Sequence, residues 1–147
     1  MDVHLDELYQ EVVLDHYRNP RNKRRLPGAD VDRSQKNPVC GDEVELQLKI
    51  RDGRVADAYF LGQGCSISQA SASMLTEALK DKSLQEAQDI ATAFRLLLQG
   101  KDPGDLELLG DLVALRGVSH YPVRVKCAEL AWDTFQTGVK EWTARRP

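Results

Sequence analysis

A predicted β-hairpin constrains the fold of this 147-residue chain more than any other feature. In EVELQLKI (43–50), apolar side chains alternate with charged or amide ones, which is typical of a strand with one buried face; the apolar residues are Val44, Leu46, Leu48 and Ile50. RDGR then supplies Asp-Gly, a strong hairpin signal, and VADAYFL follows as the return strand. Residues 29–35 are a further strand candidate. We therefore expect an antiparallel sheet with one face left for helices to cover.

Helical patterns flank this sheet. The first covers about residues 3–18 and ends before the proline of RNPRN. His16 lies beside its apolar stripe, and we expect it to pack there or to be partly exposed rather than to bind a ligand. SISQASASMLTEALK (66–80) is rich in Ser and Ala and should let another backbone come close. SLQEAQDIATAFRLLLQG (83–100) has a capping box, Ser83 with Glu86, and Gly100 at its end.

The C-terminal third combines a link with a long helix. The link, about residues 101–121, is punctuated by Pro and Gly and is expected to hold one short helical segment. The last helix should start around residues 122–125 and run towards Thr143, burying Leu130, Trp132, Phe135 and Val139. The order of helix, strands and helices predicts a single α+β domain over residues 1–147. Its small antiparallel sheet, of about three strands, should have helices packed on one face.

Charge and hydropathy exclude several classes of partner. The net charge of −3 offers no electrostatic basis for binding nucleic acid. No apolar run approaches the roughly 18 residues that span a bilayer, and MDVHLDELYQ lacks the basic and apolar regions of a signal peptide. We therefore expect a cytoplasmic protein with no membrane partner. The basic stretch RNPRNKRRLPG, with five cations in residues 18–25, is interpreted as a solvated connector, with a docking patch for an acidic partner as the alternative.

Three cysteines lie at the ends of the predicted elements. Cys40 sits in the loop PVCGD before the first clear strand, Cys65 where GQGCS turns from strand to helix, and Cys127 in the first turns of the last helix. An odd count in a chain with no export signal favours reduced thiols. A helix N-terminus favours the thiolate form, and Arg124 and Lys126 act in the same direction. The neighbouring glycines should let a large atom approach the backbone.

These thiols suggest a shared site, with Asp42 as the fourth ligand. A Cys₃Asp set suits zinc, and it also suits iron on the way to a cluster. The intervals of 25 and 62 residues do not match the paired C-x₂-C pattern of zinc fingers. The residues alone therefore leave an alternative open. In it, Cys65 and Cys127 are small core residues, Cys40 is a loop residue and Asp42 belongs to a turn.

Three motifs carry a resemblance to a known family. NPVCGD (37–42), GQGCSISQASASML (62–75) and YPVRVKCAELAW (121–132) resemble the cysteine motifs of the IscU/NifU-N family of iron–sulfur cluster assembly proteins, and LYQEVVLDHYRNPRN (8–22) is similar to its N-terminal helix. The resemblance implies an IscU/SufE-like fold and sulfur supplied by a cysteine desulfurase. It also implies Cys40, Asp42, Cys65 and Cys127 as metal or cluster ligands, with Cys40 as the sulfur acceptor.

Two departures look like the SufU branch of that family. Lys126 stands where typical members carry a histidine, and about residues 101–120 form an insertion. His120 would replace that histidine only if the link folds inward. The Leu-Pro-Pro-Val-Lys pattern that a specialised Hsp70 chaperone reads is not reproduced. The SufU branch implies bound zinc and a persulfide relay from a SufS-type desulfurase. Whether the protein is an enzyme stays open: we expect no stand-alone enzyme, with a zinc-dependent sulfurtransferase that acts with the desulfurase as the alternative.

Other functions remain open at this stage. One is a scaffold that assembles a [2Fe–2S] cluster and passes it to Fe–S recipient proteins. Another, of a different class, is a purely structural zinc domain. Arg124 and Lys126 would either activate a nearby persulfide or cluster sulfur, or dock a partner. We expect the chain to be a monomer or a weak dimer.

Overall fold

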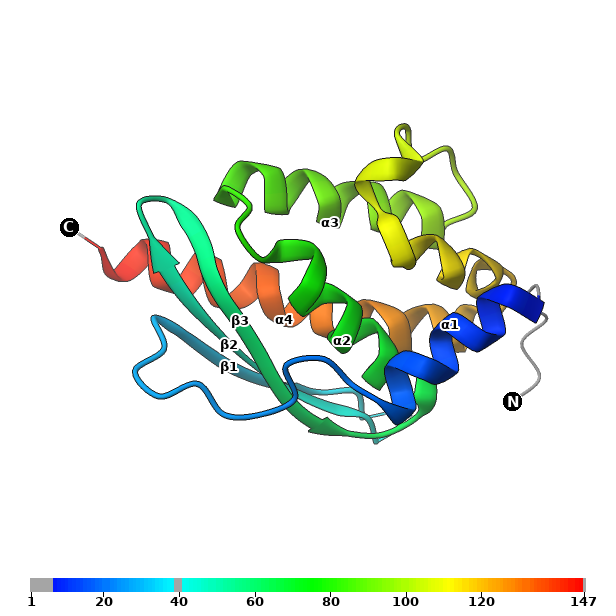
Figure 1. The fold of residues 1–147 in the computed structure, drawn as a ribbon, viewed down its shortest axis with the longest axis horizontal. Coiled ribbons are helices and arrows are strands. Elements are labelled where there is room, and N and C mark those ends of the chain that lie inside the picture. The colour runs from blue at the N-terminus through cyan, green and yellow to red at the C-terminus, as the bar shows by residue number, and fades with distance from the viewer. Residues whose placement is uncertain (1–6, 39–40, 147) are drawn as a thin grey trace.

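The computed structural model describes residues 7–38 and 41–146. These residues form a three-stranded sheet, four α-helices and a 3₁₀-helical link, arranged as in Figure 1. In chain order the elements are α1 (Glu7–Arg18), β1 (Val31–Lys36), β2 (Glu43–Arg51), β3 (Arg54–Gln63), α2 (Ser66–Leu79), α3 (Leu84–Leu98), η1 (Leu106–Leu108), η2 (Gly110–His120) and α4 (Pro122–Arg145). None of the helices in these two ranges is long and apolar enough to cross a membrane.

The sheet has the order β1-β2-β3, and both strand pairs are antiparallel. Asp52 and Gly53 form the predicted turn between β2 and β3, with φ angles of 53° and 72°. Two successive positive φ angles match the type I′ turn, whose twist suits a hairpin. The third strand candidate is also confirmed, shifted slightly to Val31–Lys36.

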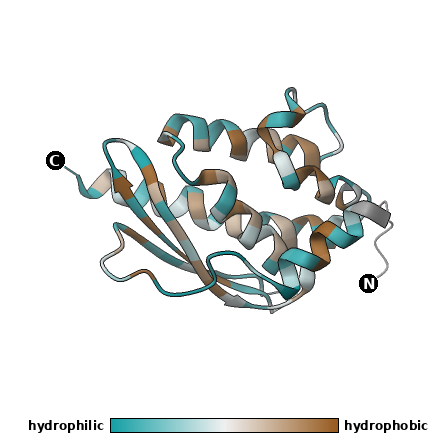
Figure 2. Ribbon diagram, in the orientation of Figure 1, coloured by the Kyte–Doolittle hydropathy of each residue, from teal (hydrophilic) through white to brown (hydrophobic). Residues whose placement is uncertain are grey.

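Helices cover one face of the sheet. On the inward face of β2, Val44, Leu46 and Leu48 are fully buried and Ile50 is partly buried. Helix α2 packs against β3, and α4 packs against β1 and β2. Figure 1 shows α3 on the side of α2 and α4 that faces away from the sheet, with α1 running beside α2. Apolar segments meet between these layers (Figure 2). The predicted α+β class is therefore confirmed, as is burial of Leu130, Trp132, Phe135 and Val139.

A buried serine fixes the distance between α2 and α4. The Ser71 hydroxyl donates to the backbone carbonyl of Ala128 at 2.7 Å and accepts from the indole N–H of Trp132 at 3.2 Å. Ser71 is completely buried, so a small side chain is what allows this approach. The Ser/Ala-rich sequence of α2 thus lets the backbone of α4 come close, as its composition predicts.

The link after α3 differs from the prediction of one short helical segment. It contains η1 and the 11-residue η2, both 3₁₀ helices. The buried residues Leu109, Leu112, Leu115 and Val118 recur every third position. That interval equals the three residues per turn of a 3₁₀ helix, so one apolar edge stays aligned toward the core. The period of three is the sequence signal that identifies this element.

The basic stretch forms intramolecular contacts along the edge of the fold. Arg21 pairs with Asp15 at 2.6 Å, Arg25 pairs with Glu45 at 3.0 Å, and Arg24 lies over the Tyr59 ring at 4.6 Å from its centroid. These contacts tie the segment between α1 and β1 to the sheet and to α1. They support the interpretation as a connector.

Candidate metal centre

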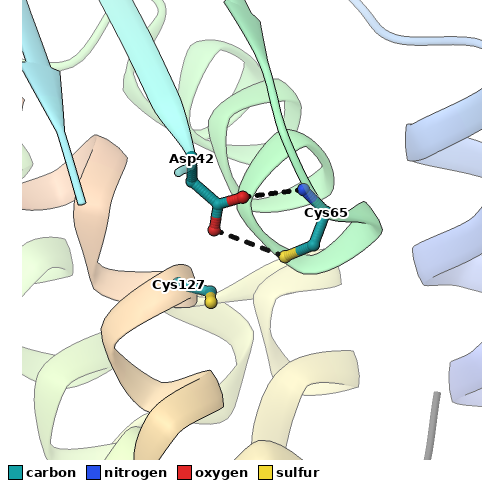
Figure 3. Close-up of side chains that lie close together, drawn as sticks. All are labelled: Asp42, Cys65 and Cys127. Atoms are coloured by element: carbon teal, nitrogen blue, oxygen red, sulfur yellow. Dashed lines mark hydrogen bonds between the residues drawn. The ribbon is translucent and has the colours of Figure 1, made fainter. Parts of the chain in front are cut away.

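Asp42 is the buried acid of the site, immediately before β2. Its side chain is 1% exposed, and Oδ1 accepts the backbone N–H of Cys65 at 2.8 Å. Oδ2 accepts a hydrogen bond from the Cys65 thiol at 3.5 Å (Figure 3). The carboxylate therefore lies at the N-terminus of α2, where the positive end of the helix dipole favours a negative charge.

Cys65 is the N-cap residue of α2. Its backbone is extended, with φ −70° and ψ 163°, and Sγ accepts the backbone N–H of Ser68 at 3.4 Å. This confirms that the thiol lies at a helix start, as the sequence predicts.

Cys127 comes from the second turn of α4 and completes a three-residue group. Its side chain is fully buried, and Sγ lies 3.6 Å from the carbonyl oxygen of Val123. One donor atom from each of Asp42, Cys65 and Cys127 lies within 4.8 Å of the other two. Figure 3 shows the three side chains converging from the start of β2, the start of α2 and the start of α4.

The donor set and its spacing fit a zinc ion. Two ligands about 2.3 Å from a tetrahedral zinc are about 3.8 Å apart, so only a small closure of this group is required. Thiolate and carboxylate donors are both ordinary zinc ligands, and three of them leave one tetrahedral position for a fourth. The same three residues could also hold iron, because thiolates bind iron in clusters.

Gly64 makes room for the acid. Its φ is +144°, and a Cβ built there would contact Asp42 Oδ1 and lie 2.8 Å from Asp42 Cγ. The sequence suggested that glycines near Cys65 let a large atom approach the backbone. In the structure, the group that comes close to Gly64 is the Asp42 side chain.

Arg124 and Lys126 have different surroundings, although from the sequence both are expected to favour the thiolate form of the cysteines. Burial lowers the pKa of Arg124, but hydrogen bonding to Cys127 and the charges of Cys65 and Cys127 outweigh it, so its pKa is raised. The guanidinium therefore faces both sulfurs. Lys126 is exposed, and its charge acts on the carboxyls of Glu129 and Asp133.

Cys40 and His120 are the remaining predicted positions. Cys40 lies outside the described residues; in the described chain beside it, Gly41 is exposed and Asp42 is buried. His120 is exposed and lines a separate surface hollow with Arg116 and Lys101. Within residues 7–38 and 41–146, the donor group at this centre contains Asp42, Cys65 and Cys127 and no histidine.

Comparison with known proteins shows similarity over nearly the whole chain. The zinc-dependent sulfurtransferase SufU of Bacillus subtilis is 46% identical, over 94% of this chain and 93% of that protein. The iron–sulfur cluster assembly scaffold protein IscU of Streptococcus pyogenes is 38% identical, over 92% and 85%. A solved structure from Fervidobacterium islandicum, assigned as an iron–sulfur cluster assembly scaffold protein for the SUF system, is 32% identical. It superimposes with a TM-score of 0.83 over 88% of this chain and 94% of its own.

The family model gives the same result. The model described as the NifU-like N-terminal domain matches residues 8–128, a span that includes all but the first residue of α1, the whole sheet and all three cysteines. The chain therefore belongs to the NifU-like N-terminal domain family.

Proposed function

We propose that this chain accepts sulfur from a cysteine desulfurase and relays it to iron–sulfur cluster assembly. In this proposal a zinc ion is held by Asp42, Cys65, Cys127 and Cys40. The observation that carries it is the convergence of the first three donor atoms within 4.8 Å. The 46% identity to a zinc-dependent sulfurtransferase supports the choice of metal and of reaction.

The sulfur acceptor in this proposal is Cys40. Its thiolate attacks the terminal sulfur of the desulfurase persulfide, a new S–S bond forms, and the old S–S bond breaks. The desulfurase cysteine leaves as a thiolate, so the persulfide moves without net oxidation or reduction. Zinc, when bound, keeps its ligand thiols deprotonated at neutral pH.

The other ligands would stay fixed while Cys40 reacts. Cys65 is held by the Ser68 N–H, and Cys127 is buried in α4. Asp42 is held by the Cys65 N–H. These three residues would hold the ion while Cys40 carries out the exchange. Arg124, which faces both sulfurs, would stabilise negative charge on them.

The test combines desulfurase turnover with metal analysis. With a SufS-type desulfurase as the proposed partner, wild-type protein should hold one equivalent of zinc and increase alanine release. Cys40→Ser should abolish that increase. A Cys40→Ser protein that still accepted sulfur at the normal rate would refute the role of Cys40. Asp42→Ala should weaken zinc binding less than Cys65→Ser or Cys127→Ser does, because a zinc–thiolate bond is the stronger one here.

A scaffold function is the second candidate, favoured by the similarity to the S. pyogenes IscU scaffold. It predicts that zinc-free protein, given ferrous iron and sulfide without oxygen, forms a brown [2Fe–2S] product and transfers it to an apo-ferredoxin-type recipient. A colourless product under those conditions, together with stimulated desulfurase turnover, would exclude the scaffold function and support the sulfur relay. A purely structural zinc site makes two different predictions. A chelator should unfold the chain, and desulfurase turnover should be the same with and without this protein.

A further inference from the structure

A second group of metal-binding side chains lies away from the thiols, where α1, α2 and η2 meet. Nε2 of His16 is 2.9 Å from Oδ2 of Asp111 and 4.0 Å from Oε1 of Glu77. One donor atom from each of these residues lies within 4.8 Å of the other two. The imidazole is 1% exposed, while the two carboxylates are about half exposed at 49% and 59%. The group therefore has a rigid buried member and two accessible ones.

The imidazole is oriented by its other nitrogen. Nδ1 of His16 lies 2.9 Å from the Ser73 hydroxyl, which also accepts the backbone N–H of Arg21 at 2.9 Å. A hydroxyl can donate to Nδ1 or accept from it, so it supports either tautomer of the ring. A hydrogen bond to the remote nitrogen is the usual way in which a metal-binding histidine is held in position. Nε2 is thus fixed toward the two carboxylates.

The carboxylates open onto a hollow of about 440 Å³, as expected of a site that keeps water ligands. Its lining includes His16, Glu77 and Asp111, together with Glu107 and Lys82. Three carboxylates face one lysine, and Arg21 Nε approaches Glu77 at 3.7 Å. Glu107, also in the lining, could supply a third oxygen and so a fourth donor atom. The hollow therefore offers one nitrogen, several oxygens and space for solvent.

We propose that His16, Glu77 and Asp111 form a second site, for a divalent first-row transition metal ion. The ion would bind Nε2 and one oxygen from each carboxylate, and the proton on Nε2 would leave to solvent. A nitrogen and oxygen donor set suits manganese, ferrous iron or zinc, whereas the thiolate centre favours softer ions. The two sites thus differ in the metals they prefer. His16, expected from sequence to pack beside the stripe of α1, acquires this role because Asp111 reaches it from η2.

Manganese separates the two sites experimentally, because it is a poor competitor for zinc at thiolates. Full-length protein loaded with one equivalent of zinc is titrated with Mn²⁺, and the free ion is followed by electron paramagnetic resonance. We expect one further Mn²⁺ per chain. Asp111→Asn and Glu77→Gln should each weaken its binding at least tenfold while the zinc content stays the same. Asp89→Asn, at an exposed aspartate of α3, is the matched control and should leave Mn²⁺ binding unchanged.

A second readout locates the ion. Bound Mn²⁺ should broaden the ring signals of His16 in the NMR spectrum at substoichiometric amounts and leave those of His120 sharp. The proposal is overturned if Asp111→Asn and Glu77→Gln bind Mn²⁺ as the Asp89→Asn control does. It is overturned equally if no saturable Mn²⁺ binding occurs, since the His16–Asp111 contact is then a structural ion pair only.

Discussion

Gly64→Ala tests whether the position of Asp42 controls the metal centre. Gly64 has a φ of +144°, and an added Cβ would lie 2.8 Å from Asp42 Cγ and 2.9 Å from Asp42 Cα. Both distances are shorter than a Cβ tolerates, and the second involves backbone. Asp42 must therefore move, and with it the carboxylate that accepts the Cys65 N–H.

The expected cost has two parts. An alanine forced to a positive φ costs roughly 1–2 kcal/mol, and overpacking a buried contact costs about 1–3 kcal/mol. We therefore expect Gly64→Ala to lower the free energy of unfolding by about 2–5 kcal/mol. Displacing a metal-binding carboxylate from its hydrogen-bond donor should also weaken zinc binding by about 10- to 100-fold.

Gly28→Ala is the matched control. Gly28 also has a positive φ, +70°, but a Cβ there would meet nothing within 4 Å. It should cost only the backbone part, about 1–2 kcal/mol, and leave zinc affinity unchanged. Urea denaturation of the zinc-free proteins gives the stabilities, and competition with a chromophoric chelator gives the zinc affinities. The reasoning fails if the two variants are equally destabilised and bind zinc equally well.

Three further predictions concern packing, pH and metal. Ser71→Ala leaves the Trp132 indole N–H and the Ala128 carbonyl without this partner, so urea denaturation should show a loss of about 1–3 kcal/mol; a neutral effect would contradict the role of Ser71 between α2 and α4. Hydrogen bonds from the backbone and side chain of Ser83 lower the pKa of Glu86. The Glu86 carboxylate therefore stabilises the folded chain above the ordinary carboxyl pKa, and this stabilisation is lost as pH falls through the lowered value. Glu86→Gln should therefore melt below wild type at pH 7, with a gap that narrows in acid; a gap that widens in acid would refute this sign. Zinc at 100 times its dissociation constant should stabilise wild type by about 2.7 kcal/mol, and Cys127→Ser should show no such gain in a calorimetric melt.

Much of the fold follows from local patterns. Strict alternation in 43–50 and Asp-Gly at 52–53 fix a hairpin because side chains on a strand alternate faces and the turn requires positive φ angles. Ser83 and Glu86 mark the start of α3 because both satisfy backbone N–H groups there. The link after α3 was predicted less well, since its repeat of three was not distinguished from loop.

The candidate site was predicted only in part. The residues suggested a shared site of Cys40, Asp42, Cys65 and Cys127, and the resemblance implied the same set. The structure brings the last three together, while Cys40 lies outside the described residues. Spacing alone could not do so, because contacts across 23 or more residues depend on how the sheet and helices pack. The sequence likewise could not predict that Arg124 and Lys126, only two residues apart, have different surroundings. They leave α4 on different sides, and only packing shows which side faces the thiols.

The sequence by itself determined which segments are the strands and the α-helices, and that each described cysteine lies at or near a helix start. Those properties depend on short-range sterics and on backbone hydrogen bonds between near neighbours. Tertiary structure alone decided that the starts of β2, α2 and α4 meet at one point, and that η2 carries Asp111 to the buried His16 of α1. Burial of apolar surface drives that packing, and it is a property of the whole chain.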